Sequence, residues 1–293
     1  MTRNMSFIFN VLAKFFKCVG CFFEKLAQTK DAHERQVQRA SSDHDMASHP
    51  DEPYYAVQYL YWIQQVIDKE FPKKQALALD LGCGQGRLTV PLATYCHKIT
   101  GVDFTKTAIE SARLYARQKG CGNIDFIEGD LLTYLETQSK EVLDFIILTE
   151  VVFFLPTYKK VLDEIFRVLK PGGMAFISFR SQYFDVLFSV QNRKWEAAKM
   201  AVEQREGYLW GGQTWFSWQT KDDVQMLLQQ SGFREIDCAG IGVCSGIEGD
   251  PLAGIVRPSL LDTQDKERLQ TLETRLAKDY VNNGRYILAM ARK

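Results

Sequence analysis

The chain has 293 residues, with 36 basic and 36 acidic side chains and a formal net charge of zero. A neutral molecule lacks the field that would attract a polyanion, so we expect no nucleic-acid partner. Seven cysteines, an odd number spread along the chain, predict no disulfide framework and fit a reducing, cytoplasmic compartment. The length suits one large domain with appendages.

Residues 1–28 are predicted to form an amphipathic, Phe-rich helix. Lys14 and Lys17 interrupt its apolar surface, which leaves it short of the roughly 20 apolar residues that a bilayer span needs. The same lysines argue against a signal peptide. Two alternatives stay open for residues 5–27: peripheral contact with a membrane surface, or docking on the enzyme itself or on a second subunit of a homodimer. Residues 29–52 are polar and are expected to be a linker or a lid.

The most informative segment, residues 77–93, predicts an apolar strand, a glycine turn and the start of a helix. Gly82, Gly84 and Gly86 can adopt positive φ and carry no Cβ, so the backbone can turn sharply and lie against a ligand. Their Gly-x-Gly-x-Gly spacing differs from the Gly-x-Gly-x-x-Gly fingerprint of dinucleotide sites, and Asp80 stands two residues before the first glycine. A tight turn without a ligand is the alternative.

A second apolar run, residues 98–103, ends in Asp103. An acid at the end of the second strand can accept both hydroxyl groups of a ribose. Asp103 could equally cap a helix that begins near Thr105, and a cap and a ligand contact can coexist.

Strand and helix patterns alternate along most of the chain. Strands are expected at 76–81, 98–103, 123–128, 142–148 and 173–179, and helices at 86–95, 105–119, 131–138 and 157–169. A capped helix from Thr220 and strands at 234–240 and 286–291 follow. This alternation implies right-handed crossovers and therefore an α/β, doubly wound, mostly parallel sheet.

From about residue 53 to the end, the chain resembles the class I S-adenosylmethionine (SAM) dependent methyltransferases. The resemblance rests on the glycine turn, on Asp103, on the segment 123–132 and on the Lys-Pro-Gly-Gly turn at 170–173. It implies a Rossmann-like sheet of seven strands with the last strand antiparallel, SAM as the cofactor and S-adenosylhomocysteine (SAH) as the product. Residues 53–293 are then the methyltransferase domain.

The resemblance also assigns a cofactor site. Asp130 is expected to accept the exocyclic amine of adenine, because a carboxylate is only an acceptor; the alternative is a cap on the short helix that follows. The expected cofactor contacts are Asp80, Gly82, Cys83, Gly84, Gly86, Asp103, Phe104, Gly129, Asp130, Leu131 and Thr149.

Two insertions are expected to decide which acceptor binds: residues 181–219, after the fifth strand, and residues 246–283, before the last strand. The first is rich in aromatic side chains, which could wall a flat or apolar acceptor or bind a cation; packing of these rings onto the sheet is the alternative. The aromatic helix near residue 59 lies where many small-molecule methyltransferases carry a lid. The expected acceptor contacts are Tyr54, Tyr55, Arg180, Tyr183, Trp210 and Trp215.

The sulfonium of SAM already activates its methyl group, so such an enzyme mainly has to align a nucleophile and exclude water. A hydroxyl or a carbon acid also needs a base, and Glu150 and His49 are the candidates. Glu150 directly follows the fourth strand, but contact of its backbone with the cofactor or a structural hydrogen bond is an equal alternative. No His, Asp and Glu set has metal-ligand spacing, so no metal is expected.

Residues 149–153, Thr-Glu-Val-Val-Phe, differ from the Asn/Asp-Pro-Pro-Tyr/Phe motif of methyltransferases that modify adenine or glutamine nitrogens. The expected activity is therefore methyl transfer to an O, N or C atom of a small molecule, which would be lipophilic or quinone-like if the N-terminal helix seeks a membrane. The protein would then be cytoplasmic or peripheral to a membrane. The alternatives are a catalytically idle SAM-binding scaffold and, disfavoured by the glycine spacing, a nicotinamide enzyme.

Overall fold

The computed structural model describes residues 50–71, 75–209 and 215–293. The predicted N-terminal helix, the linker up to residue 49, His49 and Trp210 lie outside these residues. In the part of the chain that is described, no helix is long and apolar enough to cross a membrane.

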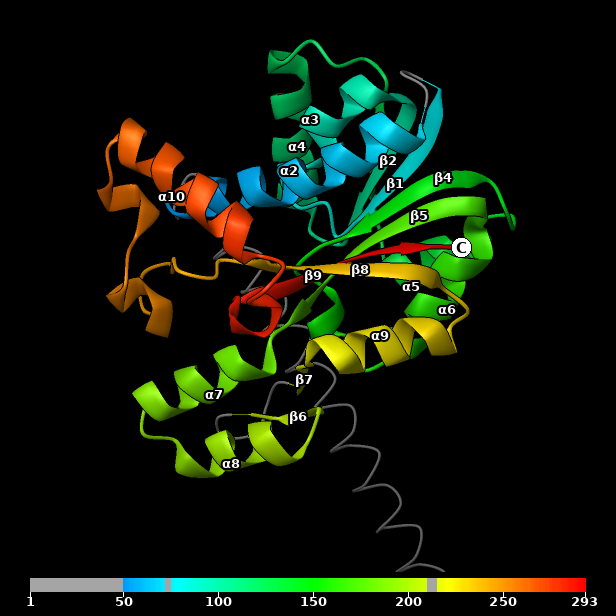
Figure 1. Ribbon diagram of the computed structural model, residues 1–293. Helices are drawn as coiled ribbons and strands as arrows, with labels where there is room; N and C mark the ends of the chain where they lie inside the picture. Colours follow the sequence, from blue (N-terminus) through cyan, green and yellow to red (C-terminus); the bar gives the residue numbers. More distant parts are fainter. Residues whose placement is uncertain (1–49, 72–74, 210–214) are drawn as a thin grey trace, which may run out of the picture.

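A seven-stranded sheet forms the centre of the molecule, in the order β3-β2-β1-β4-β5-β9-β8 (Figure 1). β9 pairs antiparallel with both β5 and β8, and the pairs from β3 to β5 are parallel. The α/β class and the antiparallel last strand are therefore confirmed. The strands are β1 (Ala76–Leu81), β2 (Cys96–Asp103), β3 (Ile124–Glu128), β4 (Leu143–Leu148), β5 (Leu169–Arg180), β8 (Arg234–Ile241) and β9 (Tyr286–Arg292).

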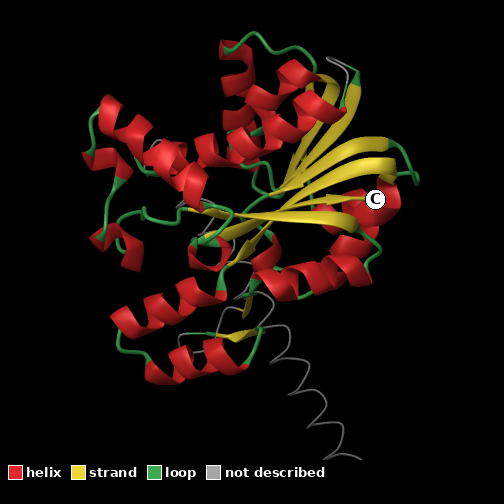
Figure 2. Cartoon of the chain, in the orientation of Figure 1, coloured by secondary structure: helices red, strands yellow, loops and turns green. Residues whose placement is uncertain are grey.

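Helices cover both faces of the sheet (Figures 1 and 2). One face carries α2 (Glu52–Glu70), α3 (Thr89–Leu92) and α4 (Lys106–Gln118), and the other carries α5 (Leu131–Thr137), α6 (Tyr158–Val168) and α9 (Lys221–Gln230). Thr220 and Asp223 form a reciprocal capping box at the start of α9, which confirms the predicted helix start.

Helix α2 is held on the sheet by an apolar stripe. Tyr55, Tyr59, Ile63 and Ile67 are at most 1% exposed, and their spacing of four residues places them on one side of an α-helix. One side of the segment that the resemblance marks as a lid thus packs on the domain, and its role as a lid stays a prediction.

The two insertions extend beyond the sheet. The first contains α7 (Gln182–Gln191), α8 (Trp195–Glu203) and a two-stranded ribbon of β6 (Glu206–Tyr208) and β7 (Trp215–Ser217). The second contains α10 (Thr263–Leu276), which lies beside the start of α2 (Figure 1).

Two expected boundaries are wrong. The helix predicted at 86–95 is a turn followed by the short α3 and a 3₁₀ helix, Ala93–Tyr95. The Lys-Pro-Gly-Gly turn belongs to β5, which begins at Leu169. Position 173 requires glycine, because a Cβ there would lie only 2.9 and 3.0 Å from the carbonyl oxygens of Lys170 and Asp144.

Candidate cofactor and acceptor site

The loop between β1 and α3 is shaped by three glycines with positive φ: +67° at Gly82, +51° at Gly84 and +82° at Gly86. The N–H of Gly82 donates to the carbonyl of Val102 in β2 at 2.8 Å, which fixes the start of the loop. A Cβ on Gly82 would overlap the side chain of Val151, whereas a Cβ on Gly84 would have no atom within 4 Å. Gly82 therefore serves packing, and Gly84 faces open space that a ligand could fill.

Asp103, at the end of β2, turns its carboxylate toward this glycine loop. Its Oδ2 accepts the N–H of Gly84 at 2.9 Å, and its Oδ1 accepts the N–H of Thr105 at 2.8 Å. The contact with Thr105 closes a turn just before α4; Thr105 is the N-cap residue of that helix and no side chain caps it, so Asp103 does not act as the helix cap of the alternative. Each carboxylate oxygen can accept a further hydrogen bond, so the same group can also receive ribose hydroxyls.

The end of β3 lies beside the end of β2, and the N–H of Gly129 donates to the carbonyl of Asp103 at 2.9 Å. A Cβ on Gly129 would also meet no atom within 4 Å. Asp130 caps α5 by accepting the N–H and the hydroxyl of Thr133, both at 2.8 Å. The predicted cap is confirmed, and the contact of Asp130 with adenine stays a prediction.

The other predicted cofactor residues surround the same strand ends. Cys83, in the glycine loop, is buried, and so is Thr149, which follows β4 next to β1. Phe104 is 41% exposed, which suits a ring that could cover a bound ligand. Leu131 is half-buried in the first turn of α5.

Asp80 is fully enclosed at the end of β1, where its Oδ2 accepts the hydroxyl of Thr89 at 2.6 Å. Burial raises the pKa of Asp80 to about 7, with the negative charge of Asp103 adding to the rise and Thr89 and Arg87 opposing it. Asp80 therefore anchors α3 to the sheet beside the loop.

This raised pKa predicts how stability depends on pH. The folded state binds more protons at Asp80 than the unfolded state does between pH 4 and pH 7, so the free energy of unfolding falls as pH rises through this window. We expect Asp80→Asn, which still accepts from Thr89, to remove a pH-dependent contribution of up to about 4 kcal/mol. Urea unfolding of the wild type and of Asp80→Asn at pH 5 and pH 7.5 measures this contribution. If the free energy of unfolding changed with pH by the same amount in both proteins, the raised pKa of Asp80 would be contradicted.

Glu150, a candidate base, follows β4, and its side chain is only 8% exposed. Its Oε1 lies 2.6 Å from Nη2 of Arg87, and Nη1 of the same arginine lies 2.7 Å from Oε2 of Glu52 in the first turn of α2. Sequence reasoning missed both of these partners, although Arg87 directly follows the glycine turn. The role of Glu150 as a base stays a prediction, as does that of His49.

Arg180, the last residue of β5, is enclosed by aromatic rings. Its guanidinium lies 5.8, 5.1 and 5.6 Å from the ring centres of Phe153, Phe184 and Phe216. Its Nε donates to Oδ1 of Asp185 at 2.5 Å. A predicted acceptor residue thus lies in a buried, water-poor cluster at the carboxyl ends of the strands.

A second buried arginine, Arg285, contacts the same ring. Its guanidinium lies 5.3 Å from the centre of Phe184 and 5.8 Å from that of Tyr55, and its Nη1 donates to Asp250 at 2.9 Å. Sequence reasoning missed Arg285, because no motif marks the residue before β9. The structure therefore links Tyr55 and Arg180 indirectly, because Arg285 lies over the rings of Tyr55 and Phe184 and Arg180 lies over that of Phe184.

The other predicted acceptor residues lie away from this cluster or are bound to other parts of the chain. The hydroxyl of Tyr54 donates to Glu273 of α10 at 2.6 Å, and Trp215 packs on Tyr158 with ring centres 5.9 Å apart. Tyr183 is 44% exposed on α7. For Trp215, the packing alternative is the one the structure shows.

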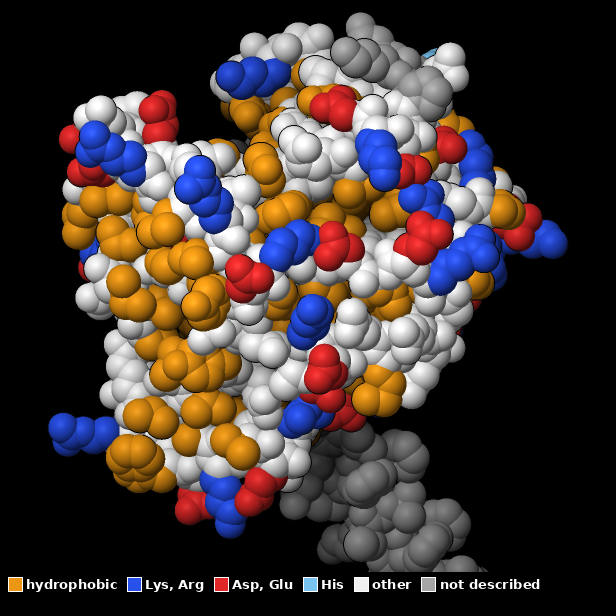
Figure 3. Space-filling view, viewed as in Figure 1, with side chains coloured by type: hydrophobic (Ala, Val, Ile, Leu, Met, Phe, Trp, Pro, Cys, Tyr) orange, Lys and Arg blue, Asp and Glu red, His pale blue; other side chains and the backbone are white. Residues whose placement is uncertain are grey.

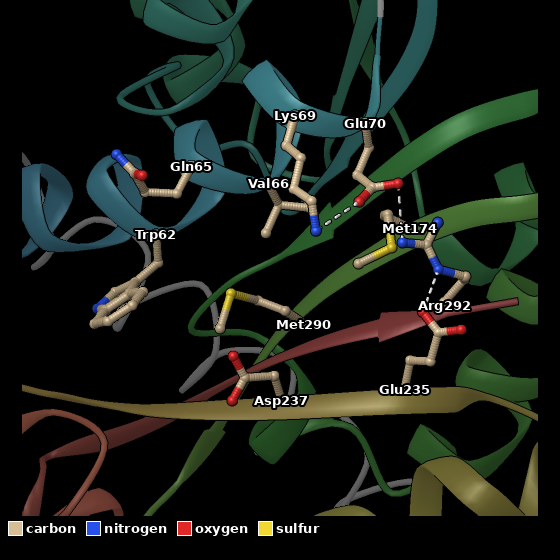
Figure 4. Close-up of a pocket in the computed structure, with 10 residues that line it drawn as sticks. All are labelled: Trp62, Gln65, Val66, Lys69, Glu70, Met174, Glu235, Asp237, Met290 and Arg292. Atoms are coloured by element: carbon tan, nitrogen blue, oxygen red, sulfur yellow. Dashed lines mark hydrogen bonds and ion pairs between the residues drawn. The ribbon is translucent and has the colours of Figure 1, made fainter.

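A groove of about 240 Å³ lies away from this site, between the later part of α2 and strands β5, β8 and β9 (Figure 4). Met174 of β5, which lines the groove, pairs with Arg292, the last residue of β9, toward the end of the sheet opposite the glycine loop. Arg292 bridges Glu70 and Glu235 at 3.0 and 2.7 Å. None of the predicted site residues lines this groove.

A doubly wound sheet with a glycine loop after its first strand, and with Asp80, Asp103 and Asp130 at or next to the ends of its first three strands, is typical of a nucleotide-type cofactor site. The family model described as "Methyltransferase domain" matches residues 72–232, more than half of the chain. The chain therefore belongs to the methyltransferase domain family, and its class I SAM-dependent methyltransferase fold is confirmed. SAM is the cofactor of this family.

Two demethylmenaquinone methyltransferases are among the similar proteins. The protein of Staphylococcus haemolyticus is 29% identical over 195 residues, covering 61% of this chain and 77% of that protein. The protein of Staphylococcus carnosus is 26% identical over 195 residues with the same coverage.

Solved structures share the fold. A possible histamine N-methyltransferase from Thermotoga maritima has a TM-score of 0.51 at 16% identity, covering 90% of this chain and 99% of that one. Phosphoethanolamine N-methyltransferase 2 of Haemonchus contortus, in complex with SAM, has a TM-score of 0.53 at 12% identity, covering 86% and 58%. At identities this low, the likeness shows a shared fold and does not assign an activity.

Proposed function

We propose that the protein transfers a methyl group from SAM to an O, N or C atom of a small, lipophilic acceptor. The observation that carries the proposal is the open space at Gly84, bordered by a loop whose N–H groups and Asp103 are already in place. A preformed loop of this kind binds a ligand without having to be ordered first.

The residues of this loop fit the cofactor. Asp103 would receive the ribose hydroxyls and Asp130 the adenine amine, while the backbone at Gly84 lies against the cofactor. When bound, SAM supplies a methyl group that its positive sulfur has already activated. The chain then has to hold the acceptor in line and keep water out, as the buried ends of β4 and β5 would do.

The cluster around Phe184 would form the acceptor side. Among the described residues, several buried polar atoms here have no hydrogen-bond partner: Arg285 Nε, Asp185 Oδ2, Ser217 Oγ and both amide atoms of Gln219. Buried polar groups in folded proteins are nearly always paired. A polar group of an acceptor, seated among the rings, would supply such partners.

Exposed apolar residues on both insertions favour a lipophilic acceptor. Trp195, Ile255 and Leu260 are 62%, 66% and 74% exposed. Figure 3 shows apolar side chains gathered over α7 and the segment that precedes α10. Such a surface can receive an apolar tail. The names of the two staphylococcal relatives point to the same kind of acceptor, a quinone-like ring.

Methyl transfer to a panel of acceptors tests the proposal. The full chain is incubated with methyl-labelled SAM and a reduced naphthoquinone in detergent micelles, or with histamine or phosphoethanolamine in buffer. With the products separated by chromatography, we expect labelled product from the naphthoquinol and none from the two amines. Binding of SAH without transfer to the naphthoquinol would contradict the proposed acceptor class.

A further inference from the structure

The loop after β4 holds a backbone conformation that its sequence does not favour. Glu150 has φ +60°, in the left-handed region that costs any residue other than glycine free energy. Its N–H donates to the hydroxyl of Ser178 at 2.7 Å. The next residue, Val151, packs against Gly82 of the glycine loop so closely that no Cβ fits between them. The conformation of Glu150 thus decides how this loop meets the cofactor loop.

Arg87 is placed to hold that conformation. Its guanidinium bridges Glu150 at 2.6 Å and Glu52 at 2.7 Å, and these side chains are only 8% and 2% exposed. The guanidinium also lies 5.9 Å from the centre of the Tyr59 ring in α2. One side chain therefore ties together the glycine loop, the loop after β4 and helix α2.

We propose that Arg87 and Glu150 are positioning residues of the cofactor site. Arg87 holds the Glu150 carboxylate, and this contact keeps residues 149–151 in the left-handed turn that lies along the glycine loop. The Glu150 carboxylate is paired with Arg87 and takes no proton from the acceptor. The inference rests on the proposed function, because the loop matters only if a cofactor binds beside it.

Two substitutions at one position separate this role from catalysis. Glu150→Gly and Glu150→Ala both remove the carboxylate, but only glycine adopts φ +60° without cost. We expect Glu150→Gly to bind SAH within about threefold of wild type, and Glu150→Ala to bind SAH about tenfold more weakly, as left-handed strain alone allows.

Arg87→Gln gives an independent readout. It should weaken SAH binding about tenfold in the wild-type chain and by a clearly smaller factor in the Glu150→Gly chain, because the contact with Glu150 acts through the backbone of residue 150, whereas the contact with Glu52 is lost in both chains. Glu141, with φ +59° at the turn before β4, is the matched control. Glu141→Gly and Glu141→Ala differ from each other by the same cost of left-handed backbone as the two variants at 150, and both should bind SAH as the wild type does.

The outcomes distinguish the inference from the function. If the wild type binds SAH but the glycine and alanine variants at 150 bind it equally, the positioning role is wrong. If Glu150→Gly binds SAH normally and loses methyl transfer, the carboxylate acts in the chemistry, which overturns the proposal. If the wild type itself fails to bind SAH, the proposed function is wrong, and the positioning role, which depends on it, is wrong as well. Thermal unfolding of each variant confirms that the protein compared is folded.

Discussion

Gly84→Val is expected to abolish binding of SAM and SAH, with a dissociation constant raised by roughly a hundredfold or more, while the chain still folds. A Cβ here would meet no protein atom within 4 Å, so we expect the valine side chain to fill the space that the cofactor would take. A clash of this kind costs about 3 kcal/mol of binding free energy. Because φ at Gly84 is +51°, valine also costs about 1–2 kcal/mol of stability. Calorimetric titration with SAH measures the first effect and urea unfolding the second.

Two other glycines make this result specific. Gly120, in the turn after α4, has φ +68° and equally open surroundings, so Gly120→Val pays the same strain and should leave SAH binding unchanged. Gly82→Val would instead overlap Val151 and should destabilise the fold. Equal loss of SAH binding in the variants at 84 and 120 would show that strain, and not the cofactor space, is responsible.

Asp103→Ala should weaken SAH binding by about 1–3 kcal/mol, or roughly 5- to 150-fold, because hydrogen bonds to a charged acceptor are lost in a buried place. Asp103 is 6% exposed. Removing it also frees the N–H of Gly84, which now donates to Oδ2 at 2.9 Å, so the glycine loop loses its anchor. The dissociation constant for SAH, measured at a temperature where the variant is folded, gives the result.

Asp262 is a matched control for this variant. It also accepts a backbone N–H, from Asp265 at 2.8 Å at the start of α10. Asp262→Ala should cost about 1 kcal/mol of stability as a lost helix cap and leave SAH affinity unchanged. If Asp103→Ala bound SAH as tightly as Asp262→Ala does, the ribose contact would have to be placed elsewhere.

The sheet could be predicted because its signals are local. Each parallel strand is a short apolar run followed by a helix pattern, and the glycines at 82, 84 and 86 adopt the positive φ values that their residue type predicted. The boundaries that failed, at α3 and at the start of β5, depend on which backbone groups find partners in neighbouring strands. That information lies in contacts between distant parts of the chain.

The acceptor side could not be predicted from the sequence for the same reason. Arg285 and Phe184 meet although 101 positions separate them, and Arg87 reaches Glu52 across 35 positions. Neither pair leaves a motif in the sequence. The aromatic residues of the first insertion could be named, but whether Trp215 packs on Tyr158 or faces an acceptor depends on how the insertion folds back on the domain. Composition alone does not determine that.

The central claim, that this site binds SAM, is tested most directly by calorimetric titration of the purified full chain with SAH, with NADH as the parallel control. The account predicts micromolar binding of SAH and no heat of binding with NADH. Binding of NADH, or of neither compound, would contradict it.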